Sequence, residues 1–529
     1  MKHFSDAADA YATVPLLNCL LQEAAEPIDG SGGSSGGSSR GVRVHRLRGS
    51  GRLLRVSGGR RPVRPELRAA AGWQSLGHAE LVKLTAEELR RSTGIANDEL
   101  PAEMADSRDV VAVLLAAREG ARPPEDPYLR SEQSLVMGHP CHPAPKARGG
   151  GPARSWLPYA PEAYASFPLE FLAVRAEDTV EEGGERAAAA VDALAELLDG
   201  PAAPPGYRLL PAHPWQLELI EAATAVRAAF ADGRLLRLGR TRLPVWPTAS
   251  VRTVHVPGRD GAGDLFAKFS LDVRITNDVR RLWRHDLLKL RETDAAVEAA
   301  FGARTAGADA ADATAGWLSD RGYRTAGFAF EELAVLVRDG LDGRLLPGTT
   351  PLLAASLVEG FTGGPLERLA DPVAWWVAYL RAVVPPALEL FAREGIVLEA
   401  HLQNTVIALD SAGLPVQALF RDAEGVKRVP GVSRAAGWQR LVYTLLVNHV
   451  REIASAIGER HPGVAGSLWP AVRRELLRCG AAYGLPEALA LPDAPELPGK
   501  ANLLLRWTGA DGASARYLPL PNPMRPSGM

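Results

Sequence analysis

The sequence predicts an α+β fold in which helical segments surround a strand-rich middle. Residues 73–118 place apolar side chains at helical spacing, and residues 186–198 are rich in Ala and Leu. Residues 207–282 instead contain short β-type runs separated by Gly and Asp turns. Helical periodicity returns over residues 331–357 and 373–391. The C-terminal part is therefore expected to be largely helical.

The N-terminal region is uneven in composition. An apolar stripe over residues 8–25 suits an amphipathic helix, although Pro15 interrupts it. Residues 30–39 form a Gly/Ser tract of the kind found in flexible linkers. Residues 40–68 are rich in Arg, with Glu66 as their only acidic residue. Because no aromatic side chains interleave with these charges for base stacking, we interpret the segment as a solvated loop rather than a nucleic-acid surface.

Several later elements can be predicted locally. Residues 265–271 alternate apolar and polar side chains after a Gly/Asp turn and predict a strand. The apolar runs 405–409 and 416–420 flank a turn rich in Gly and Pro, which predicts a β-hairpin. Trp375 and Trp376 are expected in the core.

Composition limits the possible partners. The chain has 529 residues and a net charge of −2, which gives no general attraction to nucleic acid or anionic membranes. Its three cysteines, Cys19, Cys141 and Cys479, are far apart and imply neither a disulfide framework nor a CxxC metal site. Asp6 and Asp9 precede any apolar run, and no run approaches the roughly 20 residues that span a bilayer. We therefore expect a cytoplasmic protein without membrane or nucleic-acid partners.

The most informative segments lie at the two outer ends of the predicted hairpin. Glu399, His401 and Asn404 precede it, and Asp422 and Glu424 follow it. Mg²⁺ prefers hard oxygen ligands, and phosphates need cationic or hydrogen-bonding partners. The pattern therefore favours a site for a nucleotide phosphate and its Mg²⁺. Either half taken alone is more simply a helix cap or a surface turn.

Four further polar clusters precede these segments, at residues 138–148, 211–216, 250–253 and 268–280. The first carries four basic side chains between prolines, at His139, His142, Lys146 and Arg148. A rigid loop of this kind suits the presentation of cations to a polycarboxylate. Its two histidines are not at zinc spacing with a cysteine pair, so no zinc site is predicted.

Two clusters supply donors that suit a phosphate-binding cleft. Lys268 and Arg280 stand at the ends of a probable strand and turn, where both could face one cleft. The alternative is a pair of surface cations. Ser250, Arg252 and Thr253 offer hydroxyl and guanidinium donors on one short segment, for which the alternative is a solvated strand edge.

The remaining polar residues allow structural interpretations as well. His213 and Gln216 are possible cleft residues, whereas Trp215 equally suits a turn that fills the core. His401 could be a buried, hydrogen-bonded histidine, which is the commoner fate of a lone His. Thr276 and Asn277 are expected to orient the turn before Arg280.

In this order, the clusters resemble the IucA/IucC family of siderophore synthetases that work without a peptide-synthetase template. The family pattern reads approximately GHPxHPxxKxR, HPWQ, SxRT, KLxLxxxITNxxR, HxQN and RDxEG. The resemblance runs from about Glu132 to Arg506 and includes residues 448–450 and 500–506. Two departures stand out: residues 149–151 are all Gly where an aromatic commonly follows a single Gly, and residues 40–68 lack the strands that relatives usually have.

The resemblance implies three subdomains that form a cupped hand, with the nucleotide in its central cleft. Their expected extents are residues 1–131 for the thumb, 132–330 for the fingers and 331–529 for the palm. The resemblance also implies an ATP- and Mg²⁺-dependent ligase that adenylates a carboxylate, most simply citrate or a citryl or succinyl derivative. An amine, hydroxylamine or alcohol would then attack the acyl carbon to give a siderophore or its precursor, with AMP and pyrophosphate released. Many relatives look like homodimers.

Individual roles follow from the same resemblance. Lys268 would contact a phosphate, and the planar fork of Arg280 would bridge the α-phosphate and the carboxylate. The implied catalytic residues are Arg280, His401 and Arg252. The implied ATP-binding residues are Ser250, Arg252, Thr253, Lys268, Arg280, His401, Asn404 and Asp422. The substrate-binding residues would be His139, His142, Lys146, Arg148 and Arg280, and the metal ligands Glu399, Asn404, Asp422 and Glu424.

Two other functions remain open at this point. A phosphotransferase would use His401, Asn404 and Asp422 in a kinase-like site, although no GxGxxG loop precedes the Lys268 strand. A non-catalytic or redox iron-siderophore protein is the second, because the C-terminal part of the family resembles ferric-siderophore reductases. Iron–sulfur reductases need a cysteine cluster, and Cys479 is the only cysteine in the C-terminal half.

Overall fold

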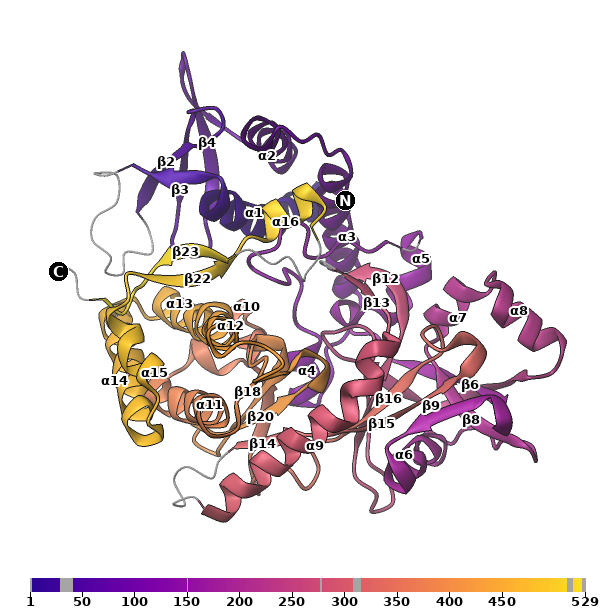
Figure 1. Cartoon of the computed structure of the whole chain (residues 1–529). Helices are drawn as coiled ribbons and strands as arrows, with labels where there is room; N and C mark the ends of the chain where they lie inside the picture. The colour runs from indigo at the N-terminus through magenta and orange to yellow at the C-terminus, as the bar shows by residue number, and fades with distance from the viewer. Residues whose placement is uncertain are drawn as a thin grey trace.

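A computed structural model describes residues 2–28, 41–149, 151–275, 278–307, 315–510 and 517–525 of the chain. The described elements form three parts, each built around its own sheet (Figure 1). The Gly/Ser tract and the pair Thr276 and Asn277 lie outside the described residues.

The N-terminal part combines three helices with a five-stranded antiparallel sheet. The helices are α1 (Lys2–Glu23), α2 (His78–Thr93) and α3 (Glu99–Glu119). The strands pair in chain order and are β1 (Ala25–Pro27), β2 (Val42–Leu47), β3 (Leu53–Ser57), β4 (Val63–Ala69) and β5 (Gly72–Ser75). Leu47, Leu54, Val56 and Leu67 are buried and join the core that the helices share.

Two expectations for this part are wrong. Residues 40–68 form strands rather than a solvated loop, because alternate apolar residues supply one buried face between the arginines. The many arginines in this segment made the alternation of apolar residues, which is typical of strands, hard to recognise in the sequence. Helix α1 also continues through Pro15, since Leu16, Leu17 and Leu20 are fully buried and tertiary packing outweighs the one lost backbone hydrogen bond.

The middle part is an eight-stranded antiparallel sheet. Its strand order is β7-β15-β16-β11-β10-β9-β6-β8. The strands are β6 (Phe167–Arg175), β7 (Thr179–Glu182), β8 (Tyr207–Ala212), β9 (Leu235–Pro247), β10 (Thr253–Val256), β11 (Leu265–Phe269), β15 (Asp320–Ala326) and β16 (Val335–Asp339). A separate hairpin pairs β12 (Leu271–Ile275) with β13 (Asp278–Arg280). The predicted strands over residues 207–282 are confirmed.

Six helices accompany this sheet or connect it to the other parts. They are α4 (Pro127–Glu132), α5 (Ala153–Trp156), α6 (Gly184–Leu197), α7 (Pro214–Ile220), α8 (Thr224–Ala231) and α9 (Arg284–Gly307). Helices α6, α7 and α8 surround the sheet at the outer end of the molecule, and the long α9 lies where the middle part meets the C-terminal part (Figure 1).

The C-terminal part packs helices against a four-stranded sheet of order β14-β20-β19-β17. These strands are β14 (Ala315–Leu318), β17 (Thr350–Leu353), β19 (Thr405–Leu409) and β20 (Pro415–Arg421). The helices are α10 (Ala354–Glu359), α11 (Pro372–Glu394), α12 (Arg434–Leu441), a π-helix (Val442–Val450), α13 (Arg451–Arg460), α14 (Ala465–Tyr483) and α15 (Pro486–Ala490). The hairpin β19–β20 and the buried Trp375 and Trp376 are confirmed.

The boundaries between the parts are more interleaved than the sequence suggested. Strand β14 lies before residue 330 but pairs with β20 of the C-terminal sheet, whereas β16 lies after it and belongs to the middle sheet. The helix expected over residues 331–357 is wrong up to residue 353, because β16 and β17 occupy much of that segment and only α10 is helical. Fully buried strands lack alternation, so their apolar runs resemble helical ones.

The C-terminal end of the chain returns to the N-terminal part. Strands β22 (Glu496–Lys500) and β23 (Tyr517–Pro521) form a hairpin, and α16 (Asn502–Thr508) lies beside α1 (Figure 1). The backbone N–H groups of Leu503 and Leu504 donate to Glu23 at 3.0 and 2.8 Å. None of the described helices has the length and apolar run that crossing a bilayer requires.

Candidate active site

Lys268 on β11 is the point where the motif segments meet. The sheet register pairs it with Thr253 on β10 and Leu336 on β16. Its Nζ donates to Asp422 Oδ1 at 2.5 Å and to Glu424 Oε2 at 2.7 Å. Both carboxylates follow β20, so the hairpin β19–β20 brings them to the face of the eight-stranded sheet. The acidic residues that follow the hairpin therefore meet Lys268 at one place.

Asp422 has a structural role that its sequence position did not reveal. Arg338 Nη2 donates to Asp422 Oδ1 at 3.0 Å, and Arg338 Nε donates to Asp320 Oδ1 at 2.6 Å. The backbone N–H of Ala423 donates to Asp320 Oδ2 at 2.9 Å. Asp422 itself adopts φ +83°, a left-handed conformation that a non-glycine residue keeps only when its surroundings hold it. Asp320 and Arg338 provide that support.

The electrostatics keep both carboxylates ionised. Burial would raise the pKa of Asp422, but Lys268 and Arg338 hold that pKa well below its ordinary value. Burial opposes ionisation of Glu424 in the same way, and Lys268 and Arg252 lower its pKa. Two ionised carboxylates therefore pair with Lys268.

The segment with Ser250, Arg252 and Thr253 forms a tight turn beside Lys268. Ser250 Oγ accepts from the Thr253 N–H at 3.2 Å, and the intervening Val251 is buried with φ +67°. A β-branched residue in the left-handed region is a strained conformation that clusters at functional sites. Arg252 Nη2 lies 3.3 Å from Glu424 Oε2. The solvated strand edge is therefore not what this segment forms.

Arg280 ends the hairpin β12–β13 next to the same turn. Its backbone carbonyl accepts from Arg252 Nη1 at 3.0 Å, and its own Nη2 donates to the Ile275 carbonyl at 2.8 Å. Arg252 also donates to the Arg281 carbonyl at 3.0 Å. Arg252 thereby fixes the end of β13 and ties Arg280 to the Lys268 cluster.

His401 caps the short helical turn of residues 402–404. Its Nδ1 accepts from the Gln403 N–H at 3.3 Å, and its Nε2 lies 3.3 Å from Asn404 Nδ2. Burial lowers the pKa of His401, so the imidazole is neutral near pH 7. With Nδ1 accepting from the backbone, the neutral ring carries its proton on Nε2, which faces the Asn404 side-chain amide.

Glu399 joins the two outer ends of the hairpin. Its carboxylate pairs with Arg440 and packs directly against Gly425. A Cβ built on Gly425 would lie 2.0 Å from Glu399 Oε2, so a larger residue here would displace the Glu399 carboxylate. This close approach explains the glycine that ends the RDAEG segment.

Two residues outside the predicted site position these segments. Glu132 at the end of α4 is fully buried, and its Oε1 pairs with Arg421 Nη1 at 2.8 Å while its Oε2 accepts from the Ala249 N–H at 3.0 Å. Arg421 in turn donates to the Gln403 carbonyl at 2.8 Å. Glu132 therefore links the Ser250 turn, the end of β20 and the His401 turn.

His449 supports the His401 segment from behind. Its Nδ1 lies 2.7 Å from the Ala400 carbonyl, and its Nε2 lies 2.5 Å from the Tyr379 hydroxyl. A carbonyl only accepts, so Nδ1 carries the proton and Nε2 accepts from Tyr379. The sequence signal for His449 was the late Asn-His-Val segment, but its partner could not be read from the sequence.

The proline-rich loop of residues 138–148 divides between two environments. His139 lies near His401, and its pKa is lowered to about 4 by burial and by nearby cations. His142 is buried and accepts from the Ala144 N–H through Nδ1 at 3.1 Å. Of the predicted substrate-binding residues in this loop, His139 is the one placed beside the cluster.

Lys146 and Arg148 are engaged elsewhere. Lys146 Nζ and Arg148 Nη2 both contact Glu162 Oε1, at 2.5 and 2.6 Å, and all three side chains are at most 6% exposed. Burial raises the pKa of Glu162, but the two cations lower it to about 2. The sequence suggested that this loop presents the two cations to a polycarboxylate. In the structure, Glu162 holds both of them.

The segment of residues 211–216 is mainly structural. Trp215 is 1% exposed and lies in the core. Gln216 Oε1 accepts from the Asp272 N–H at 2.7 Å, and its Nε2 donates to the Glu332 carbonyl at 2.9 Å. His213 caps α7 by accepting from the Trp215 N–H at 3.2 Å. The core alternative for Trp215 is confirmed, and Gln216 has no polar group left for a cleft.

The cluster offers oxygen ligands for a cation. Asp422 Oδ2, Glu424 Oε1 and Asn404 Oδ1 have no hydrogen-bond partner among the described residues, and both carboxylates are ionised. These are the hard donors that Mg²⁺ prefers. No group of three His, Cys, Asp or Glu side chains in the described ranges is arranged for a metal by itself. The residues therefore fit a Mg²⁺ that shares its coordination with a bound phosphate.

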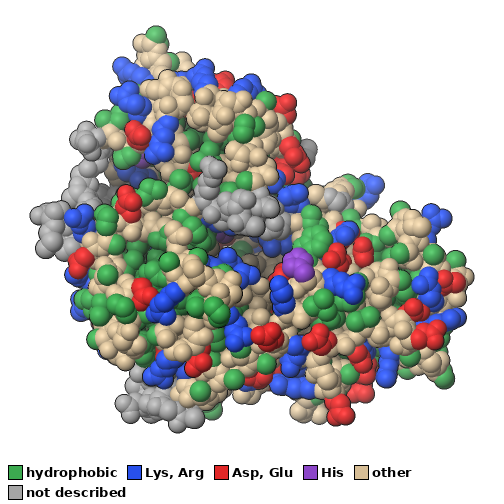
Figure 2. Space-filling view, viewed as in Figure 1, with side chains coloured by type: hydrophobic (Ala, Val, Ile, Leu, Met, Phe, Trp, Pro, Cys, Tyr) green, Lys and Arg blue, Asp and Glu red, His purple; other side chains and the backbone are tan. Residues whose placement is uncertain are grey.

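Positive side chains surround the hollow at the centre of the molecule. Figure 2 shows Lys and Arg side chains at the rim of this hollow, between the three parts. Arg451 at the start of α13 has no side-chain hydrogen bond or ion pair among the described residues. Burial, and then the charge of Arg60, lower its pKa to about 10. No sequence motif pointed to Arg451.

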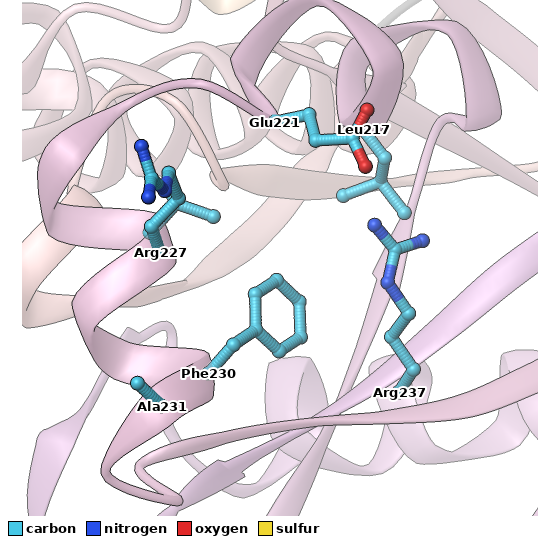
Figure 3. A pocket seen from close by; sticks show the side chains of 7 residues that line it. Leu217, Glu221, Arg227, Phe230, Ala231 and Arg237 are labelled. Atoms are coloured by element: carbon cyan, nitrogen blue, oxygen red, sulfur yellow. The ribbon is translucent and has the colours of Figure 1, made fainter.

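A cavity lies apart from the motif site. It has a volume of about 490 Å³ and lies at the outer end of the middle part, between α7, α8 and β9 (Figure 3). Phe230 and the guanidinium groups of Arg227 and Arg237 line it, with Glu221 on the α7 side. None of the predicted site residues lines it.

Two family models match the chain. The IucA/IucC family model matches residues 127–359, and a model described as ferric iron reductase FhuF-like transporter matches residues 373–515. The first range contains the Ser250, Lys268 and Arg280 segments. The second contains the His401 and Asp422 segments, as expected from the likeness of the family's C-terminal part to iron-siderophore reductases.

Sequence relatives extend over most of the chain. L-2,3-diaminopropanoate–citrate ligase of Staphylococcus aureus is 30% identical over 449 residues, covering 76% of this chain and 75% of its own length. Rhizobactin siderophore biosynthesis protein RhbC of Rhizobium meliloti is 29% identical over 478 residues, covering 79% and 80%.

A solved structure shares the fold. ATP-bound aerobactin synthetase IucA from a hypervirulent pathotype of Klebsiella pneumoniae matches with a TM-score of 0.77 at 22% identity, covering 98% of this chain and 99% of that one. This likeness confirms the α+β class, with its strand-rich middle and helical C-terminal part. Together with the 30% identity to a ligase of which three quarters is covered, it shows that the chain belongs to the IucA/IucC family of siderophore synthetases.

Proposed function

We propose that this protein is an ATP-dependent ligase of siderophore biosynthesis that adenylates a carboxylate and passes the acyl group to an amine, hydroxylamine or alcohol. The acyl donor is citrate or a closely related polycarboxylate, since the S. aureus relative is named as a citrate ligase. In the first step, the donor carboxylate attacks the α-phosphate of ATP, and pyrophosphate leaves. In the second, the nucleophile attacks the acyl carbon, and AMP leaves.

The observation that carries the proposal is the contact of Lys268 with Asp422 and Glu424. It brings cations and ionised carboxylates together at one place, beside Arg252 and Arg280. A triphosphate needs cations for its own charge and carboxylate oxygens for the Mg²⁺ that accompanies it. A purely structural ion cluster needs neither the unpartnered carboxylate oxygens nor the strained Val251 turn.

Each residue has a defined task in this proposal. Lys268 contacts a phosphate of the bound nucleotide, and this contact replaces part of its ion pairing with Asp422 and Glu424. Arg252, Ser250 and Thr253 hold the phosphates from the neighbouring turn, and neutral His401 donates through Nε2. Asp422, Glu424 and Asn404 hold Mg²⁺, which offsets phosphate charge when bound. Glu399, paired with Arg440 and packed on Gly425, holds the segment from outside the coordination sphere.

The carboxylate end of the site is assigned to three residues. Arg280 bridges the attacking carboxylate and the α-phosphate, because a guanidinium can engage two oxyanions at once. His139 and Arg451 contact the donor's remaining carboxylate groups. Arg451 supports this assignment because a half-buried guanidinium without a side-chain partner gains most from pairing with an anion.

Product analysis tests the proposal directly. The full chain is incubated with ATP, Mg²⁺ and a panel of citrate, succinate and 2-oxoglutarate, with hydroxylamine as a surrogate nucleophile. We expect carboxylate-dependent release of pyrophosphate and AMP, together with a hydroxamate product. Formation of ADP in place of AMP would show a phosphotransferase and contradict the proposal.

Redox chemistry on the FhuF-like part is not proposed. The match over residues 373–515 reflects the shared C-terminal architecture. Cys479 is the only cysteine within that range, and it is fully buried on α14. An iron–sulfur cluster needs several thiolates, which this part of the chain does not contain.

A further inference from the structure

The turn between β3 and β4 reaches from the N-terminal sheet to the C-terminal part. Gly58 adopts φ +88°, where a Cβ would lie 2.8 Å from the Arg61 carbonyl, so glycine allows the turn to close. Arg43 Nη2 donates to the Gly59 carbonyl at 2.8 Å and braces the turn from β2. The two residues at its tip, Arg60 and Arg61, then extend away from their own sheet.

Arg60 contacts residues that neighbour His139 and Arg451, which we assign to the acyl donor. Its Nε donates to Glu452 Oε1 at 2.7 Å, and its Nη2 lies 2.7 Å from Cys141 Sγ. The Arg60 side chain is 11% exposed and that of Glu452 is 2% exposed. Cys141 belongs to the proline-rich loop that carries His139, and Glu452 directly follows Arg451 on α13.

The charges in this pocket do not balance. Arg60 and Arg451 bring two guanidinium groups beside the single carboxylate of Glu452. Arg60 takes that carboxylate, and Arg451 has no side-chain partner among the described residues. Burial lowers the pKa of Arg451, Arg60 lowers it further, and Glu452 raises it, so all three groups interact. Pairing between Arg60 and Glu452 therefore leaves one half-buried cation, Arg451, available to an external anion.

We propose that Arg60, supplied by the N-terminal sheet, is a positioning residue that occupies Glu452 and so keeps Arg451 available for a second carboxylate of the acyl donor. The inference rests on the proposed function and deepens it, because it selects donors with more than one carboxylate. Without Arg60, Glu452 is left buried and unpaired, and its charge then acts on Arg451, with which it already interacts. The N-terminal region, which lies outside both family-model matches, would then contribute to donor specificity.

Binding of the donor tests this inference without requiring turnover. Calorimetric titrations of the full chain use citrate, succinate and 2-oxoglutarate as probes, and ATP is titrated separately. For the tightest of the three carboxylates, we expect Arg60→Met to weaken binding by about 10- to 100-fold, the equivalent of losing one charge-assisted hydrogen bond. ATP affinity should change by less than about twofold, because the Lys268 cluster does not involve Arg60.

A double variant separates positioning from simple anchoring of the turn. In Arg60→Met/Glu452→Gln, the competing carboxylate is gone, and carboxylate affinity should return to within about threefold of wild type. Arg60→Lys retains the pairing with Glu452 and should rescue binding. Glu452→Gln alone should bind the carboxylate at least as tightly as wild type, a result that remains informative if Arg60→Met fails to fold.

Arg61→Met is the matched control. Arg61 lies on the same turn and pairs with Glu459 on α13, with Nε and Oε2 3.5 Å apart. The Arg61→Met variant should leave carboxylate affinity unchanged. Wild-type affinity in Arg60→Met, or a double variant as weak as Arg60→Met, would overturn the inference, as would a wild-type chain that binds none of the three carboxylates. Pyrophosphate release by the wild-type chain tests the proposed function separately, since a chain can bind a carboxylate without adenylating it.

Discussion

Lys268 Nζ and Asp422 Oδ1 lie 2.5 Å apart, although 154 residues separate them in the chain. The contact joins the eight-stranded sheet to the hairpin of the C-terminal sheet. Because Arg338 also donates to Asp422, this carboxylate serves two cations before any ligand binds. Substitutions at Asp422 therefore test a residue that has both structural and chemical tasks.

For Asp422→Asn, we expect loss of pyrophosphate release by at least about 100-fold, because a metal ligand and a charge partner are both weakened. The neutral amide also removes the negative charge that pairs with Lys268 and Arg338, so the free energy of unfolding should fall by about 3 kcal/mol. The ion pairs of Asp422 with Lys268 and Arg338 are the reason for this effect on stability. Steady-state kinetics with varied Mg²⁺ and a thermal melt are the measurements.

The control for Asp422→Asn is Asp410→Asn. Asp410 lies in the turn at the opposite end of the same hairpin and accepts from the Ala412 and Leu414 N–H groups through Oδ1. Asparagine keeps that acceptor, so activity and melting temperature should stay near wild type. Normal pyrophosphate release in Asp422→Asn would contradict the metal assignment.

Arg280 should affect the chemical step more than ATP binding. For Arg280→Ala, we expect kcat to fall about 100-fold, or about 3 kcal/mol, with a much smaller change in KM for ATP. Arg280→Lys should rescue poorly, since a point charge cannot fork between two oxyanions. Steady-state kinetics with ATP and carboxylate varied separately measure kcat and both KM values. Arg274→Ala, an exposed position on the same hairpin, is the control, and wild-type kcat in Arg280→Ala would rule out the bridging role.

Glu132→Gln should destabilise the assembly of the site. Glu132 is fully buried and pairs with Arg421, so the neutral amide leaves that guanidinium buried without its counterion. We expect a loss of about 3–5 kcal/mol in unfolding free energy, measured by chemical denaturation. Glu125→Gln, at an exposed position just before α4, should have no effect. Equal stability of the two variants would show that Glu132 does not hold the three segments together.

Lys146→Met distinguishes a structural role from substrate binding. Because Lys146 pairs with the buried Glu162, we expect a clear drop in melting temperature and a carboxylate KM within about threefold of wild type. Thermal melts and kinetics are compared on the same preparation. An unchanged melting temperature together with a tenfold higher KM would instead support the role that the proline-rich loop suggested from sequence.

His449 predicts a specific dependence of stability on pH. Burial lowers its pKa to about 4, below the ordinary value of 6.5, and the hydrogen bond to the Ala400 carbonyl offsets only part of this effect. The unfolded chain therefore binds a proton more readily, so this contribution is complete above pH 6.5 and declines as the pH falls toward 4. For a shift of this size the loss reaches about 3 kcal/mol at pH 4.

The His449→Gln variant should show a shallower decline of melting temperature between pH 6.5 and 4 than wild type. His285, whose side chain is 71% exposed, provides the comparison, since His285→Gln should leave the profile unchanged. Parallel profiles for wild type and His449→Gln would contradict the assignment.

Local sequence patterns predict several of the elements that carry the site. The hairpin of residues 405–421 and the buried Trp375 and Trp376 could be predicted, since turn chemistry and apolar runs act within a few residues. The order of the polar segments also identified the family before any contact was known. Fully buried strands such as β16 were misread because an apolar run without alternation carries no sign of its period.

The sequence by itself determined which ionisable residues are available, in what order, and on which local elements they lie. Only the tertiary structure decided how they pair. Lys146 and Arg148 belong to Glu162, Lys268 to Asp422 and Glu424, and Arg60 to Glu452. The physical reason is that a buried charge must find a counterion, and which one it finds depends on strand register and burial, which bring together residues far apart in the chain.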